Sequence, residues 1–196
     1  MGVIKKIIFA DDNSMHRSLL KSNLRAAGAE LGIDFEILGE GEDGVQLLDL
    51  YSKAVPGSVD IVFSDIRMPN MDGLSALVKI QQLNPKQKMV MVSSEDLQKM
   101  DIANAAHGEA ARKTLEQSQR MDLLNKVAER IRKNIVEDGK TNSILTGCEK
   151  LMLDPIWIAE QYGASGYLRK PYDQGKTKEI LQHLLNPSKI KFLAKA

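Results

Sequence analysis

The sequence predicts an α/β fold, a doubly wound parallel sheet of five strands that carries a helical insertion. Over residues 4–94, short apolar runs alternate with segments whose apolar residues recur at helical spacing, a pattern typical of β-α-β units that pair in parallel. Right-handed crossovers in such units place helices on both faces of the sheet. A long helical stretch without a strand signal separates the fourth and fifth apolar runs, which indicates the insertion.

The strands and helices of this sheet follow in order from the apolar pattern. Gly28 is expected to end the first helix, because glycine is favoured immediately after a helix C-terminus. Helices are expected where leucines and other apolar residues recur every three or four positions, at residues 14–27, 45–50, 74–83 and 176–185. Strands are expected at residues 4–10, 35–38, 59–63, 88–92 and 166–170.

The composition argues against a nucleic-acid or membrane protein. The 196 residues carry 27 lysines and arginines against 26 acidic residues, a formal net charge of +1, whereas nucleic-acid-binding proteins usually show a basic footprint. No apolar run approaches the roughly 18 residues that a membrane span needs. The single cysteine, Cys148, cannot form an intrachain disulfide, so nothing points to an oxidising compartment. We therefore expect a cytoplasmic protein.

Polar side chains stand at the ends of four predicted strands. Asp11 and Asp12 follow the first strand and Asp65 follows the third. Ser93 follows the fourth strand and Lys170 ends the fifth. In an open parallel sheet, ligands bind outside the carboxyl ends of the strands, so these side chains are expected to converge. A single acid in such a place is more often a helix cap, but chance rarely places all five together.

The residue types at these strand ends indicate phosphoryl chemistry with a metal. Three carboxylates at one edge repel one another and raise one another's pKa values. A divalent cation relieves that repulsion, and Mg²⁺ suits a site with few carboxylates, several waters and a phosphate ligand. An ammonium and a hydroxyl group suit phosphoryl oxygens rather than the metal, which assigns Lys170 and Ser93 to a phosphoryl group.

Five separated blocks of the sequence carry these residues. The blocks are residues 8–14 (IFADDNS), 42–44 (EDG), 64–73 (SDIRMPNMDG), 91–94 (MVSS) and 163–171 (GASGYLRKP). In this order they resemble the receiver domain of two-component response regulators, especially the CheY-like proteins, over Val3 to about Asn186 with one large interruption. The resemblance implies a flavodoxin-like fold and a stand-alone switch in a phosphorelay, with chemotaxis as one candidate pathway.

The resemblance assigns the acidic residues to phosphoryl transfer. Asp65 corresponds to the phosphoacceptor, a carboxylate nucleophile that forms an aspartyl phosphate. Asp12 corresponds to a direct ligand of Mg²⁺, or of Mn²⁺, beside Asp65 and the backbone carbonyl of Arg67. Asp11 is expected to act on the same metal largely through a bound water.

The resemblance assigns the remaining site residues to the phosphoryl group and the switch. Lys170 is expected to pair with the phosphoryl group, and Ser93 to donate a hydrogen bond to it. Tyr167 and Ser94 correspond to the switch, although a tyrosine in a last strand equally often packs with a wet hydroxyl. The family takes its phosphoryl group from a histidine kinase or phosphotransfer protein. It catalyses only its own phosphorylation and dephosphorylation, so we expect a switch rather than a metabolic enzyme.

Residues 95–154 interrupt the resemblance, because the family joins its fourth and fifth strands by one helix. That helix either begins after Asp154, a favourable N-cap that Pro155 follows, or occupies residues 96–107 with the extra material behind it. The apolar spacing predicts a helical hairpin, in which Cys148 is a core residue. The hairpin either decorates its own domain or serves as a dimerisation or partner surface, and the sequence leaves both alternatives open.

Outside the site and the insertion, the sequence offers few functional residues. His16 and His107 are isolated and are expected to be solvated. No DNA-binding output domain is expected after the last helix, so the signal should reach a downstream protein target by protein–protein contact. An alternative function is a receiver-like interaction or scaffold module that works without phosphorylation. The expected domains are a receiver at 1–94 and 155–187, the insertion at 95–154 and a short basic tail at 188–196.

Overall fold

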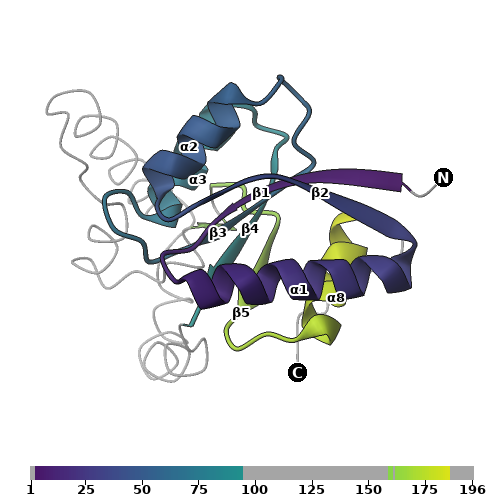
Figure 1. Ribbon diagram of the computed structural model, residues 1–196. Coiled ribbons are helices and arrows are strands. Elements are labelled where there is room, and N and C mark those ends of the chain that lie inside the picture. Colours follow the sequence, from purple (N-terminus) through teal and green to yellow (C-terminus); the bar gives the residue numbers. More distant parts are fainter. Residues whose placement is uncertain (1–2, 95–158, 161, 186–196) are drawn as a thin grey trace, which may run out of the picture.

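The computed structural model describes residues 3–94, 159–160 and 162–185 (Figure 1). The expected hairpin, its two partitions, its function and the domain boundaries therefore stay predictions. Outside the described residues lie the insertion at 95–154, the tail at 188–196, His107, Cys148, and the expected helix start at Asp154 and Pro155.

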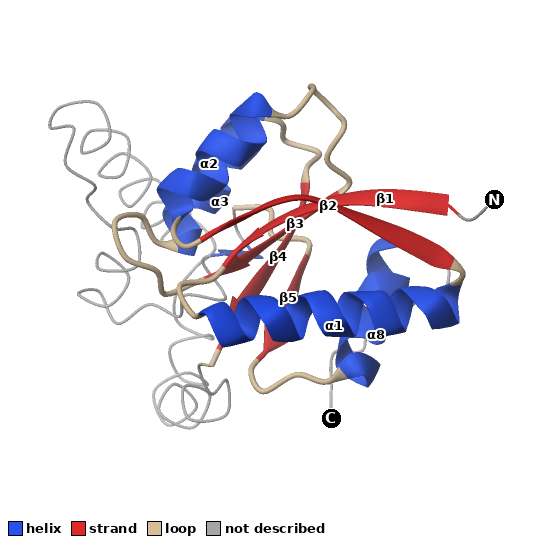
Figure 2. Cartoon of the chain, viewed as in Figure 1, coloured by secondary structure: helices blue, strands red, loops and turns tan. Residues whose placement is uncertain are grey.

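Five strands, all parallel, form the sheet of the described residues (Figure 2). They are β1 (Val3–Ala10), β2 (Ile33–Gly41), β3 (Ile61–Asp65), β4 (Lys88–Ser93) and β5 (Gly166–Arg169). Their order in the sheet is β2-β1-β3-β4-β5, which confirms the predicted doubly wound α/β fold. The order of the strands reverses between β1 and β3, and a ligand site is expected outside the carboxyl ends of the strands at such a point.

Helices cover both faces of this sheet (Figure 1). Those of the described part are α1 (Ser14–Leu31), α2 (Gly44–Lys53), α3 (Gly73–Leu83) and α8 (Gln174–Leu185). Helices α2 and α3 pack on one face, and α1 and α8 pack on the other. Among the residues that the structure describes, no helix combines the length and the apolar character needed to cross a membrane.

Two apolar cores form because successive residues of a strand point to opposite faces of the sheet. In β1, Ile8 and Ala10 belong to the core under α2 and α3. Ile7, which precedes Ile8, and Phe9, which lies between Ile8 and Ala10, belong to the core under α1 and α8. Burial on both faces explains why this strand reads as an almost continuous apolar run, the pattern from which it was predicted.

Two strands, β2 and β3, differ from their predicted bounds by more than one residue. β2 is longer than the predicted 35–38, because it lies at the sheet edge and alternates half-buried with exposed residues instead of forming an apolar run. β3 was predicted at 59–63 but begins at Ile61 and includes Asp65, which pairs with Val92 of β4. Asp65 is therefore part of β3 itself, and its backbone is fixed by pairing with β4.

The prediction that the first helix ends at Gly28 is wrong. Helix α1 continues to Leu31, and Gly32, with a φ of 68°, forms its left-handed C-cap. At Gly28 a Cβ atom would lie 2.5 Å from the carbonyl oxygen of Ile33 and 2.9 Å from the ring of Phe35. Gly28 is therefore required by the close packing of α1 on β2. The left-handed conformation that ends the helix is adopted instead by Gly32.

The loop between β3 and α3 is fixed by a hydrogen bond and by a close backbone contact with Asp65. Asp43, the N-cap of α2, accepts a hydrogen bond from Asn70 Nδ2 at 2.7 Å, and Asn70 adopts a positive φ of 59°. Gly73 begins α3 so close to β3 that a Cβ atom would lie 2.0 Å from the backbone oxygen of Asp65. Only glycine fits there, and this close approach fixes the backbone that carries the Asp65 side chain.

Candidate functional site

Asp11, Asp12 and Asp65 meet at the carboxyl edge of the sheet. Asp65 ends β3 and Asp11 follows β1, and these two strands are hydrogen-bonded neighbours. One carboxylate oxygen from each of the three residues lies within 4.8 Å of the other two. Asp11 and Asp65 are buried, whereas Asp12 is exposed. The strand-end acids therefore form one carboxylate cluster that is open to water on the side of Asp12.

The ammonium group of Lys170 reaches this cluster from the end of β5. Its Nζ lies 2.7 Å from Asp65 Oδ2 and 2.7 Å from Asp11 Oδ2, and the residue is only 9% exposed. The backbone N–H of Lys170 donates to the carbonyl of Ser93 at 2.7 Å, which extends the β4–β5 pairing and fixes the start of the side chain. One lysine thus partly neutralises two buried carboxylates.

The pKa of Asp65 is raised, because burial disfavours the charged form of its carboxyl group. The hydrogen bond and the positive charge of Lys170 lower this pKa, while the negative charge of Asp11 raises it further. The backbone N–H of Arg67, 3.4 Å from Asp65 Oδ1, has a smaller lowering effect. Burial outweighs the lysine, so the carboxylate of Asp65 is under-compensated and would gain from additional positive charge.

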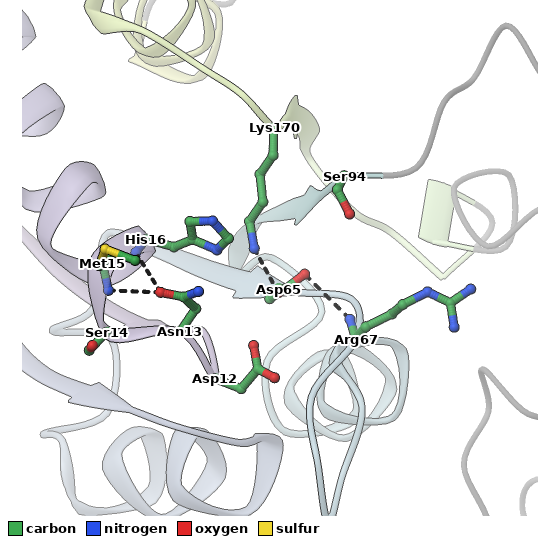
Figure 3. Close-up of a pocket in the computed structure, with 9 residues that line it drawn as sticks. All are labelled: Asp12, Asn13, Ser14, Met15, His16, Asp65, Arg67, Ser94 and Lys170. Atoms are coloured by element: carbon green, nitrogen blue, oxygen red, sulfur yellow. Dashed lines mark hydrogen bonds and ion pairs between the residues drawn. The ribbon is translucent and has the colours of Figure 1, made fainter.

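An open pocket of about 620 Å³ gives solvent access to the cluster (Figure 3). In the view of Figure 3, the start of α1 lies on one side of Asp65, and Arg67 and Ser94 lie on the other. The pocket is therefore bordered by both carboxylates and cationic groups. Its lining residues are Asp12, Asn13, Ser14, Met15, His16, Asp65, Arg67, Ser94 and Lys170.

Ser93, Ser94 and Tyr167 take different places around this pocket. Ser94 lines it, whereas Ser93 is buried at the end of β4. The carbonyl of Ser93 accepts a hydrogen bond from the Tyr167 hydroxyl at 3.3 Å. Tyr167 also packs against the core under α2 and α3, so its ring and its hydroxyl are both engaged. The predicted phosphoryl contact of Ser93 and the switch role of Ser94 and Tyr167 stay predictions.

The start of α1 contributes pocket residues to which the sequence analysis assigned no role in the site. Asn13, Ser14, Met15 and His16 all line the pocket. The prediction that His16 is isolated is wrong, because its Nδ1 lies 3.3 Å from Asp11 Oδ1 and its side chain is only 38% exposed. Helix α1 begins at Ser14, two residues after Asp12, so its first turn lies at the pocket, and that short spacing was the available signal.

The donor set fits a hard divalent cation such as Mg²⁺. Asp11, Asp12 and Asp65 offer carboxylate oxygens, the ligand type that Mg²⁺ prefers, and the exposed side of Asp12 leaves room for the waters that this ion retains. A cation would also supply the positive charge that the buried Asp65 carboxylate lacks. Arg67 follows Asp65 by two residues and lines the same pocket, so its carbonyl is a further candidate ligand.

The class of protein follows from a comparison with known families. The response regulator receiver domain family matches residues 7–128, more than half of the chain. The chain belongs to this family. The matched region runs beyond residue 94 into the predicted insertion and ends before Lys170. The structure adds what the match omits, because it places Lys170 on the carboxylates of Asp11 and Asp65.

Among curated proteins, the chain is similar to chemotaxis proteins CheY. It is 30% identical to CheY of Thermotoga maritima over 126 residues, 63% of this chain and 98% of that protein. It is 34% identical to CheY of Listeria monocytogenes over 97 residues, 50% of this chain and 74% of that protein. The CheY-like character that the motif blocks implied is thereby confirmed.

Solved structures of receiver domains share the fold. The CheX–CheY–BeF3–Mg²⁺ complex from Borrelia burgdorferi is similar with a TM-score of 0.56 and 18% identity, over 92% of this chain and 89% of that one. A response regulator receiver domain protein from Clostridium thermocellum is similar with a TM-score of 0.54 and 17% identity, over 93% and 95% of the two chains. At these identities the likeness concerns the fold.

Proposed function

We propose that this protein is a single-domain response regulator that accepts a phosphoryl group on Asp65 from a histidine kinase, or from a phosphotransfer protein, in an Mg²⁺-dependent reaction. The observation that carries the proposal is the contact of Lys170 with both Asp65 and Asp11 inside the three-carboxylate cluster. A structural ion pair needs one acid for one lysine. Three acids and one lysine leave a negative excess that a metal ion and a phosphoryl group can use together.

In the proposed transfer, the chain positions the reactants and balances their charge, which are the main contributions of proteins to phosphoryl transfer. An Asp65 carboxylate oxygen forms a bond to phosphorus while the bond from phosphorus to the donor imidazole nitrogen breaks, and the electron pair stays on that nitrogen. Lys170 exchanges its contact with the carboxylates for a contact with the phosphoryl oxygens. Asp12, Asp65 and the carbonyl of Arg67 would hold the Mg²⁺ ion, with Asp11 acting largely through a bound water, and the ion would supply further positive charge beside the phosphoryl group.

The signal is proposed to leave through the end of β4 and through β5. Phosphorylation adds about −1.5 to −2 charge units beside Ser94 and Lys170, which both line the pocket. Tyr167 donates to the carbonyl of Ser93, so a shift at the end of β4 reaches an aromatic side chain on β5. Residues 95–154 follow β4 directly, and we propose them as the dimerisation or partner surface. The protein would act in the cytoplasm, as a switch and not as a metabolic enzyme.

Labelling with a small phosphodonor tests the phosphoacceptor. The protein is incubated with acetyl phosphate and Mg²⁺, and acid-labile phosphate on the chain is measured by mass. We expect one phosphoryl group on the wild type and on Asp49→Asn, an exposed acid on α2, and none on Asp65→Asn. Chelation of Mg²⁺ should abolish labelling. Equal labelling of Asp65→Asn would overturn the assignment, and an unlabelled wild type would leave the phosphorylation-independent interaction module as the better account.

A further inference from the structure

The carboxylate of Asp11 is held by three donors in this structure. Its Oδ1 accepts a hydrogen bond from the backbone N–H of Asn13 at 3.0 Å and lies 3.3 Å from His16 Nδ1. Its Oδ2 lies 2.7 Å from Lys170 Nζ. An ionised carboxylate offers about four acceptor positions, so one remains. This supports the expected contact of Asp11 with a metal through one bound water.

The contact from His16 depends on how α1 begins. Asn13 is the N-cap, and its Oδ1 accepts from the backbone N–H groups of Met15 at 2.9 Å and of His16 at 3.4 Å. His16 is therefore the third residue of the helix, where a glutamate or glutamine commonly reaches back to the N-cap. Here the imidazole reaches back past the N-cap to Asp11. In Figure 3 the ring extends from α1 toward the end of Lys170.

Lys170 is the shortest of these contacts, but the proposed reaction removes it. If the ammonium group moves to phosphoryl oxygens, Asp11 keeps the backbone N–H of Asn13 and the imidazole of His16. These two donors act on the same oxygen, Oδ1, and so determine how Oδ2 is presented. The orientation of the carboxylate at the moment of transfer would then depend on a side chain that the sequence analysis treated as solvated.

We propose that His16 is a positioning residue, which donates its Nδ1–H to Asp11 Oδ1 and holds this carboxylate in the orientation that the cation site needs. The inference rests on the proposed function, because it concerns the same Mg²⁺ site. Carboxylates around metal ions are themselves hydrogen-bonded, and loss of such an outer partner typically lowers metal affinity by 10–100-fold. The imidazole does not bind the metal; it acts through Asp11.

Mg²⁺ affinity of full-length variants tests this role without any activity assay. The increase in melting temperature is titrated against Mg²⁺ for the wild type, His16→Leu, His16→Ala and His16→Asn. Asparagine carries an amide N–H near the place of Nδ1, so it should restore the contact. His183→Leu, at an exposed position in the last turn of α8, is the matched control.

We expect His16→Leu and His16→Ala to weaken Mg²⁺ binding by about tenfold, with His16→Asn within about threefold of the wild type and His183→Leu unchanged. Two results would overturn the role of His16: wild-type affinity in the leucine and alanine variants, or an asparagine variant as weak as they are. The comparison uses shifts relative to each variant's metal-free melting temperature, so a change in basal stability does not affect it. A wild type without any response to Mg²⁺ would instead contradict the proposed function itself, and this inference with it.

Discussion

Replacing Lys170 with methionine removes the positive charge between two buried carboxylates while nearly keeping the volume of the side chain. Asp11 is 5% exposed and Asp65 is 6% exposed, and each has an oxygen 2.7 Å from Lys170 Nζ. Removing one partner of a buried ion pair costs about 3–5 kcal/mol, because the remaining charge is left uncompensated. For a chain of this size, each kcal/mol lowers the melting temperature by roughly 2–4 °C. We therefore expect a loss of roughly 10 °C in the metal-free protein at neutral pH.

The experiment is urea and thermal unfolding in a chelating buffer, with Lys53→Met as the matched control. Lys53 makes an i,i+4 ion pair with Asp49 at 2.6 Å, but its side chain is 73% exposed. An exposed pair of this kind contributes about 0.3–0.5 kcal/mol, so the same substitution there should change the free energy of unfolding very little. A comparable loss in both variants would mean that burial of the pair does not decide its contribution.

A double variant separates electrostatics from packing. In Lys170→Met with Asp65→Asn, one of the two stranded carboxylates is gone, so much of the loss should be recovered and the two substitutions should be strongly non-additive. Mg²⁺ should also recover stability in the single variant, since it replaces the missing positive charge. The reasoning is refuted if Lys170→Met stays within about 1 kcal/mol of the wild type, a typical value for an ordinary substitution. It is also refuted if the loss is the same with and without Asp65.

Three further predictions follow from the same geometry. Because the folded-state pKa of Asp65 lies above its ordinary value of 3.8, ionisation of Asp65 destabilises the metal-free fold. The stability advantage of Asp65→Asn over the wild type should therefore be near zero at low pH and grow as the pH rises through the folded-state pKa. Urea unfolding across pH 3.5–7 measures this difference, and an advantage that does not change with pH would contradict the prediction. Gly73→Ala should cost about 1–3 kcal/mol or more, since a Cβ would lie 2.0 Å from the Asp65 carbonyl oxygen and the neighbouring backbone would have to shift. Gly175→Ala, inside α8 and without such a clash, should be neutral or stabilising by up to about 1 kcal/mol. Equal effects of the two substitutions in unfolding curves would refute the crowding argument. Deletion of residues 110–140 should leave labelling of Asp65 intact while changing sedimentation mass or partner capture; if both readouts stay as in the wild type, the segment is a decoration of its own domain.

The sequence located the acids of the site because burial on both faces of a parallel sheet produces apolar runs, and the acids follow at the ends of these runs. β1 and β3 are apolar runs that stop at acids, and the structure places Asp11 and Asp65 on adjacent strands. Lys170 could be included because it follows a fifth predicted strand, although this strand is only partly buried and Lys170 stands 105 residues after Asp65. These residues could be predicted because the same local pattern, a strand followed by a charged residue, recurs along the chain.

Residues whose role depends on a neighbour in space were the ones that the sequence misplaced. Gly28 and Gly32 are both plausible helix ends, and the packing of α1 on β2 decides between them. The first and last residues of β2 were missed, because a strand at the edge of the sheet lacks the continuous apolar run that burial on both faces produces.

By itself, the sequence determined the fold class, the resemblance to receiver domains, and the acids and lysine that meet in the candidate site. Tertiary structure alone decided that one lysine contacts two carboxylates and that His16 contacts Asp11. The physical reason is that apolar periodicity records which residues are buried, whereas a hydrogen bond depends on the position of an atom to within a few tenths of an ångström. That position follows from the packing of α1 and β5 against the sheet.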